Sequence, residues 1–185
     1  MIKARIKQTV IAVAFFAALT SFIYHFSTAE AQNPEISLLS RQTVWKPFAA
    51  AIVTQNESNL EILVVNNYTA ELWNRAYLPI TINSPDIKPM IFNLQYITES
   101  NSGNARFIAE IRNNITGEVL WSDGLNNTNG QISDQSFVLP DSILNIPVEF
   151  RLYIITEGPG EHLMNINKAT VAFSNVTQPI RVESP

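Results

Sequence analysis

Cysteine is absent from the 185 residues of this sequence, and histidine occurs only at positions 25 and 162. Without cysteine the chain forms no disulfide and has no thiolate nucleophile, so a packed core must supply its stability. Too few histidines remain for a zinc site built from several His and Cys ligands. A Ser-His-Asp triad would need His162 as its base. That residue follows Gly158-Pro-Gly160, which predicts an exposed turn, and no G-x-S-x-G elbow is present.

Charge of positive sign is also scarce. Residues 32–185 carry nine Lys and Arg against fifteen Asp and Glu. This negative balance argues against a nucleic-acid backbone as partner and suits solubility. Beyond residue 26, no apolar run reaches membrane-spanning length.

One long apolar segment is present near the N-terminus, at residues 9–26. Three cations precede it, and an Ala29-Glu-Ala31 pattern follows it, which together predict a secretory signal peptide at residues 1–31. A helix of about 18 residues would also span about 27 Å, so an uncleaved membrane anchor is the alternative. Either form exports the rest of the chain to the cell surface or beyond, with residues 32–42 as a tether. Without cysteine at the cleavage site, a bacterial-type lipid anchor is excluded.

The remaining residues, 43–185, alternate short apolar or β-branched segments with turn residues. The predicted strands lie within 43–54, 60–65, 76–83, 90–98, 105–112, 118–122, 136–139, 148–157, 165–174 and 179–183. A five-residue loop ending at Gly117 predicts a hairpin, Pro79 predicts an edge strand or bulge, and residues 123–131 predict a loop. The pattern indicates an all-β protein, an antiparallel β-sandwich of jelly-roll type preceded by an apolar helix.

Residues 150–173 resemble the closing strands of carbohydrate-binding, galactose-binding-like jelly-roll domains. The features in common are a strand, a Gly-rich turn and a second strand containing Ile166-Asn-Lys-Ala169. This resemblance implies a glycan ligand and, in many such domains, a structural calcium ion. The hairpin at residues 110–121 resembles immunoglobulin-like domains instead, which is the competing interpretation.

Aromatic side chains are the candidates for a sugar-binding site, because flat rings with a polar edge suit sugar rings. The candidates near loops or strand ends are Trp45, Tyr68, Trp73 and Tyr77. Trp73 lies in a polar stretch predicted to connect two strands, where it either binds ligand or caps the sandwich. Trp121 alternates with Val119 and is expected in the core.

Oxygen-bearing side chains mark two further kinds of site. Asp123, Asn126 and Asp134 could supply ligands to a calcium ion, although the same residue types also serve ordinary turns. Asn-x-Ser/Thr sequons stand at Asn56, Asn67, Asn114, Asn126 and Asn175. Each predicts an N-glycosylation site in an exported protein, with Asn114 at the hairpin tip the best placed.

Three functions follow, in decreasing order of support. The first is a non-catalytic exported binding module for a glycan or another envelope component. The second is an accessory subunit held at the membrane by residues 9–26 and contacting a cell-envelope protein. The third is a two-carboxylate hydrolase, for which no pair is singled out by spacing among Glu110, Glu118, Glu149, Glu157 and Glu161.

Overall fold

A computed structural model describes residues 35–84, 89–101, 104–173 and 181–183, which form twelve strands and one short 3-10 helix. The strands are β1 (Glu35–Ser37), β2 (Lys46–Phe48), β3 (Ala51–Asn56), β4 (Asn59–Asn66), β5 (Glu71–Asn83), β6 (Met90–Ser100), β7 (Asn104–Asn113), β8 (Val119–Leu125), β9 (Ser133–Leu139), β10 (Pro147–Glu157), β11 (Gly160–Phe173) and β12 (Arg181–Glu183). The 3-10 helix η1 covers Asp141–Ile143. The predicted leader and its apolar helix lie outside the described residues. Inside those ranges, no helix is long and apolar enough to cross a membrane.

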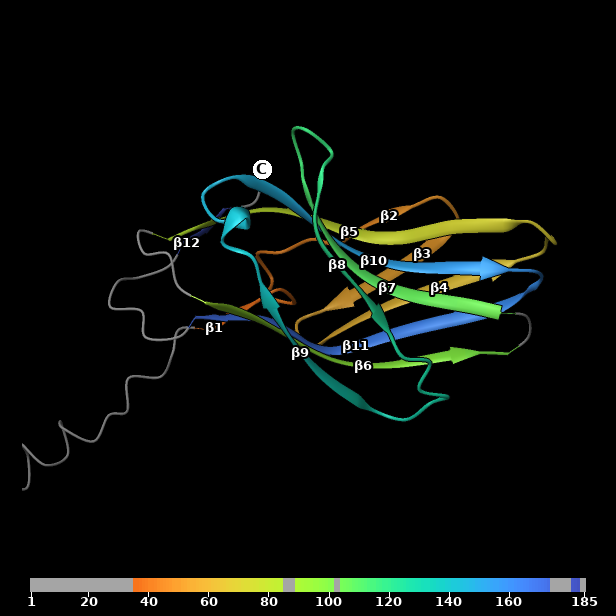
Figure 1. Ribbon diagram of the computed structural model, residues 1–185. Coiled ribbons are helices and arrows are strands. Elements are labelled where there is room, and N and C mark those ends of the chain that lie inside the picture. The colour runs from red at the N-terminus through yellow and green to blue at the C-terminus, as the bar shows by residue number, and fades with distance from the viewer. Residues whose placement is uncertain (1–34, 85–88, 102–103, 174–180, 184–185) are drawn as a thin grey trace, which may run out of the picture. The chain divides into compact units, whose positions relative to one another are not determined.

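The strands form two antiparallel sheets that face each other (Figure 1). Sheet A has the order β3-β4-β11-β6-β9, with β1 also paired to β11. Sheet B has the order β12-β5-β10-β7-β8, with β2 also paired to β5. The nested partners β4/β11, β5/β10, β6/β9 and β7/β8 alternate between the sheets, which is a jelly-roll arrangement. The predicted sandwich is confirmed, and the order differs from that of immunoglobulin-like domains.

The core lies between the sheets because side chains alternate along each strand. In β6, for example, every second residue from Met90 to Thr98 is buried, and the inward residues of both sheets form one hydrophobic cluster. Trp121 packs against this cluster as expected, with its ring 6.1 Å from Phe92 and 5.1 Å from Phe137. Val119, predicted on the same face, is 44% exposed, because the β7–β8 register shifts between Val119 and Trp121.

The predicted hairpin is confirmed as β7 and β8. Its turn is closed by the Asn113 side-chain oxygen, which accepts hydrogen bonds from the backbone N–H groups of Ile115 and Thr116. Gly117 then adopts a φ of +74°, a conformation that favours glycine. The predicted loop at 123–131 begins later than expected, because β8 continues to Leu125.

Strand β5 begins at Glu71, five residues before the predicted start, and this places Trp73 in a strand instead of a connection. Pro79 lies inside the strand and pairs with β10 on one side. On its other side, β2 stops pairing at Tyr77 and β12 starts at Thr81. Proline is tolerated there because no described strand pairs with it on that side. The strand as a whole pairs on both edges, so the predicted edge strand is found only locally, at Pro79.

The folded domain includes residues that the sequence assigned to the tether. Residues 35–37 form β1 and pair with residues 170–172 of β11. Leu38 and Leu39 follow and are 0% and 2% exposed within the core. Their apolar side chains bring this segment onto the sandwich before residue 43.

Candidate functional site

The outer face of sheet B carries a row of large side chains on β5. Trp73, Arg75 and Tyr77 point away from the core, because Asn74 and Ala76 between them are buried. The neighbouring strands add rings in register. Tyr153 of β10 lies opposite Arg75 on one side, and Phe48 of β2 lies opposite it on the other. We call the four rings Phe48, Trp73, Tyr77 and Tyr153 the aromatic platform.

Trp73 is the most exposed ring of the platform, with 50% of the residue surface accessible. Its ring centroid lies 5.8 Å from that of Tyr153 in an edge-to-face arrangement. The indole Nε1–H donates a 2.6 Å hydrogen bond to Glu71. The ring is therefore held at its edge by two neighbours while a large part of its surface stays open.

Arg75 lies at the centre of the platform. Its guanidinium carbon stands 3.7 Å from the centroid of Phe48, 5.9 Å from that of Tyr77 and 5.7 Å from that of Tyr153. These are cation–π distances, so the rings stabilise the positive charge. The Nε atom is buried and meets no hydrogen-bond partner in the described part of the chain.

A network of charged groups lies beside the platform. Arg151 bonds to Glu149 and lies 3.7 Å from Glu110, and both carboxylates are about 10% exposed. The Tyr153 hydroxyl donates to Glu110 at 3.1 Å and accepts from Arg151 at 3.1 Å. Arg112 donates to Glu110 at 2.5 Å, and this bond raises the pKa of the Arg112 guanidinium. Each charge in the network is thus compensated.

A second, more exposed set of ion pairs crosses the same face near Trp73. Arg106 lies 2.7 Å from Glu71 and 3.3 Å from Glu157. Ile155 occupies the register position between Trp73 and Arg106, and it is fully buried although it points outward. The long side chains of this face therefore pack over one another and form a layer of their own.

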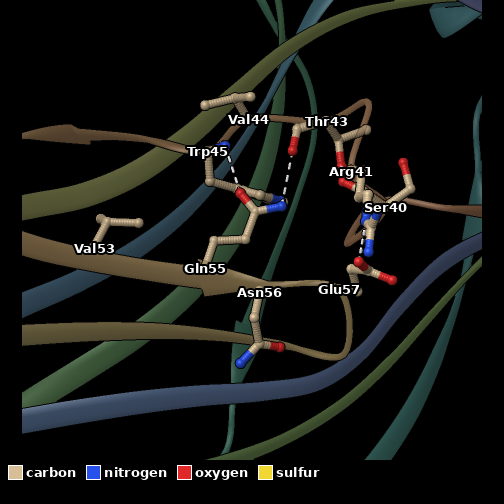
Figure 2. Close-up of a pocket in the computed structure, with 9 residues that line it drawn as sticks. All are labelled: Ser40, Arg41, Thr43, Val44, Trp45, Val53, Gln55, Asn56 and Glu57. Carbon is tan, nitrogen blue, oxygen red and sulfur yellow. Dashed lines mark hydrogen bonds and ion pairs between the residues drawn. The ribbon is translucent and has the colours of Figure 1, made fainter.

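Trp45, a predicted ligand-binding residue, belongs to the core instead. It is 4% exposed, and its indole N–H donates a 2.8 Å hydrogen bond to the Leu38 carbonyl oxygen. The residue lines a pocket of about 310 Å³ between the 40–45 segment and β3 (Figure 2). Gln55 bonds to the Trp45 N–H at 3.0 Å and to the Thr43 carbonyl at 2.8 Å, so its amide is engaged. Arg41 pairs with Glu57 at the pocket rim.

The remaining aromatic candidate, Tyr68, is 68% exposed in the turn between β4 and β5, outside the platform. The structure thus brings together Trp73 and Tyr77, and it separates Tyr68 and Trp45 from them. Four sequon asparagines are exposed, namely Asn56, Asn67, Asn114 and Asn126. The fifth, Asn175, lies outside the described residues.

The three predicted calcium ligands are distributed over two strands of different sheets and the segment that follows one of them. Asp123 lies on β8 of sheet B, where its carboxylate accepts from the Gly124 N–H. Asp134 lies on β9 of sheet A and accepts a 2.9 Å hydrogen bond from Gln95. Among the residues that the structure describes, no group of three or more His, Cys, Asp or Glu could hold a metal ion. Asn126 follows β8, and its backbone N–H is bonded to the Tyr96 hydroxyl.

The expectation that His162 is an exposed turn residue is wrong. Strand β11 begins at Gly160, so His162 is already paired and turned into the core, where it is 0% exposed. Its Nδ1 lies 2.8 Å from the Ser100 hydroxyl, whereas Nε2 has no partner among the described residues. Burial lowers the pKa of this imidazole.

Sequence reasoning missed Phe48, Arg75 and Tyr153. Alternation in residues 148–157 is the signal that could have found Tyr153, because it puts this residue on the face opposite the core, together with Glu149 and Arg151. The same face also carries Ile155. A tyrosine and an isoleucine on an outward face indicate that other side chains cover this face. Arg75 gave no such sign, because the start of its strand was not recognised.

No protein-family model matches the sequence, and no curated protein matches it. The fold is similar to those of several solved structures. An agarase has a TM-score of 0.53 at 12% identity, over 80% of this chain and 26% of the agarase chain, so the present chain spans about a quarter of that enzyme. The xylan-binding module CBM15 has a TM-score of 0.52 at 11% identity, over 77% of this chain and 98% of that one.

A mutant of a family 29 carbohydrate-binding module has a TM-score of 0.50 at 9% identity, over 79% of this chain and 99% of that one. At such identities the likeness concerns the fold. The two modules are covered almost completely, whereas the agarase is covered only in part. This chain therefore shares the β-sandwich fold of carbohydrate-binding modules.

Proposed function

We propose that this protein is a non-catalytic module that binds a glycan on the outer face of sheet B. The observation that carries the proposal is the aromatic platform. Trp73 and Phe48 expose about half of their surface, and each is held by neighbouring side chains. Apolar ring faces of this kind pack against the C–H faces of sugars. A rigid surface also loses little entropy when a ligand binds.

The polar groups of the face support a binding role over a catalytic one. A two-carboxylate hydrolase needs one carboxyl group free to give a proton and another free to attack or to activate water. Glu110 and Glu149, the buried acids of this face, both lie against Arg151, and Glu110 also bonds to Arg112. These contacts assign the two carboxylates to the framework of the face.

The place of action is part of the same proposal. We infer that residues 1–31 direct export and that the module works at the cell surface or outside the cell. N-terminal sequencing of protein from its native source tests this step. A mature N-terminus at Gln32 is expected for a cleaved leader, whereas an intact N-terminus in the membrane fraction would indicate an anchor.

The binding test compares two exposed residues on opposite faces. Trp73 is 50% exposed on sheet B, and Ile52 is 58% exposed on sheet A. The two variants are compared by affinity electrophoresis through gels containing xylan, agarose, galactan or other polysaccharides. Trp73→Ala should be retarded much less than the unaltered protein, which corresponds to an affinity about ten-fold or more weaker. Ile52→Ala should migrate like the unaltered protein. Equal retardation of both variants, or the absence of retardation in a wide panel, would overturn the proposal.

A specific observation also favours the second candidate, an accessory subunit that contacts an envelope protein. The outer face of sheet A aligns Ile52, Leu63 and Leu163 in one cross-strand row, with Val65 45% exposed beside it. Exposed apolar patches mark protein contacts when they are contiguous. Co-purification of a membrane protein that Ile52→Asp abolishes and Trp73→Ala preserves would favour this candidate.

A further inference from the structure

Among the side chains that the structure describes, the cations on the outer face of sheet B fall into two groups. Arg106, Arg112 and Arg151 each pair with at least one glutamate. Lys46 and Arg75 form no ion pair with any residue that the structure describes. Two positive charges of this face are therefore uncompensated, in a chain whose net charge is −4.

These two cations lie together at one corner of the sheet. Lys46 is opposite Tyr77 in the β2–β5 register, and Phe48 is opposite Arg75. From Trp73 to Thr81, the outward positions of β5 hold no acidic residue, and β2 holds none either. The described acids of the face lie elsewhere and are already bound by arginines: Glu71 at the start of β5 and Glu157 at the end of β10 by Arg106, Glu110 on β7 by Arg112, and Glu149 on β10 by Arg151.

The described surroundings of Arg75 lack a hydrogen-bond acceptor for its guanidinium group. A guanidinium carries five N–H donors, and no hydrogen bond satisfies them within the described ranges. Phe48 covers one side of the group at 3.7 Å, and the Nε atom is buried without a partner. Stacking on a ring leaves the edge of the planar fork for an acceptor, and such a fork matches the geometry of carboxylate and related oxyanions.

We propose that the glycan bound here carries an acidic group, a carboxylate or a sulfate, which Arg75 and Lys46 bind while its sugar rings pack on the aromatic platform. This inference rests on the proposed function, because it names the ligand class of that same site. A neutral sugar would leave both charges uncompensated. An acidic one supplies an acceptor at the place where the described residues provide none.

The test uses two pairs of polymers, each with one backbone and with or without the acidic group: polygalacturonate against its methyl-esterified form, and dextran sulfate against dextran. Affinity is measured by isothermal titration calorimetry on the full chain. One charged polymer should bind with an affinity at least about ten-fold higher than that of its neutral partner, and added salt should weaken this binding. Arg75→Gln should remove most of this preference, and Lys46→Gln should weaken binding by a few-fold. Which pair responds identifies carboxylate or sulfate as the group.

Lys168→Gln is the matched control, because it removes one exposed cation from the outer face of sheet A. Its affinity should stay within about two-fold of the unaltered protein, since an exposed charge on the opposite face is screened. An equal loss in Lys168→Gln and Lys46→Gln would show non-specific attraction and overturn the inference. Equal binding of charged and neutral polymers would also overturn it while the glycan-binding proposal stands. Failure of every polysaccharide, neutral or charged, would overturn both.

Discussion

The outer faces of the two sheets occupy equivalent positions in the sandwich but are built in opposite ways. On sheet A, the outer face combines polar side chains, joined by local hydrogen bonds such as Ser136 to Asn93 at 2.8 Å, with the apolar row of Ile52, Leu63 and Leu163. On sheet B, aromatic and guanidinium groups pack so closely that Ile155 is fully buried beneath them. The charges differ in the same sense. The Arg151–Glu149 side chains are 15% and 10% exposed, against 49% and 42% for Lys168–Glu35.

This difference indicates on which face a ligand would bind with the smaller loss of conformational entropy. Side chains that are already ordered lose little entropy on binding, whereas mobile exposed ones must first be fixed. Burying charges has a cost that partners must offset, and a sandwich needs no such layer outside its core. The ordered layer on sheet B therefore supports the proposal that a ligand binds on this face.

The largest expected effect comes from breaking the charge network of sheet B. Arg151→Ala leaves Glu110 and Glu149 without their shared partner in a poorly solvated layer. Removing one member of a buried pair costs roughly 3 kcal/mol or more. Urea denaturation followed by tryptophan fluorescence measures the change in the free energy of unfolding.

The matched variant on sheet A is Lys168→Ala, which breaks the exposed pair with Glu35. Exposed pairs contribute about 0–1 kcal/mol, so this variant should unfold near the midpoint of the unaltered protein. If the two variants lost equal stability, the contrast between the faces would be wrong.

A smaller effect is expected from Tyr153→Phe, which removes one hydroxyl and keeps the ring. The hydroxyl bonds to Glu110 and Arg151, both at 3.1 Å. Hydrogen bonds to charged groups contribute about 1.5–3 kcal/mol. The substitution should therefore decrease the free energy of unfolding by an amount within that range or smaller. Glycan affinity should change little, because the ring still supports Trp73. A large loss of affinity with unchanged stability would instead assign the hydroxyl to direct ligand contact.

Much of the fold could be predicted from alternation and turn residues. The β7–β8 hairpin could be predicted because its signals are local, namely alternating apolar residues and a glycine in the turn, Gly117, which adopts a positive φ in the structure. The start of β5 was not, because residues 71–75 mix charged, apolar and polar side chains, and the outward positions Glu71, Trp73 and Arg75 carry no regular apolar–polar alternation. For the same reason β1 was read as a tether, since only its pairing with β11 makes it a strand.

The site was less predictable, because it depends on register between distant segments. Trp73 and Tyr77 were chosen for their chemistry, but Arg75 gained meaning only when Phe48 and Tyr153 were placed on either side of it. Trp45 has the same chemistry as Trp73, yet its indole is bonded inside the core. Burial of His162 likewise depends on where β11 begins, which the Gly-rich turn left undetermined.

On the inner face of sheet A, His162 is buried with one ring nitrogen near the Ser100 hydroxyl and the other, Nε2, without a hydrogen-bond partner among the described residues. Its folded-state pKa is lowered by burial from the ordinary 6.5, so the unfolded chain binds more protons below that value. Stability should be constant above pH 6.5 and fall as pH decreases from 6.5 through the folded pKa. The slope is at most about 1.4 kcal/mol per pH unit for one proton.

Urea denaturation at pH 7.5 and pH 5.0 measures this loss, and His162→Gln should reduce it. Glu35 does not interfere, because bonds from Thr170 and Lys168 lower its pKa below 4.5, so its contribution is lost only at more acidic pH. An unchanged pH dependence in His162→Gln would show that other groups cause the acid sensitivity.

The smallest effect is expected at Ile52, on the outer face of sheet A. The side chain is 58% exposed on the edge strand β3, opposite Leu63. Ile52→Thr keeps a β-branched residue in the strand and removes little buried surface, so the free energy of unfolding should change by about 0.5 kcal/mol or less. Denaturation and sedimentation velocity on the same sample should both match the unaltered protein. A decrease in the sedimentation coefficient of the variant would mean that this face contacts another copy of the chain in solution. The outer face of sheet A would then bind a protein partner, and the outer face of sheet B would remain the proposed glycan-binding face.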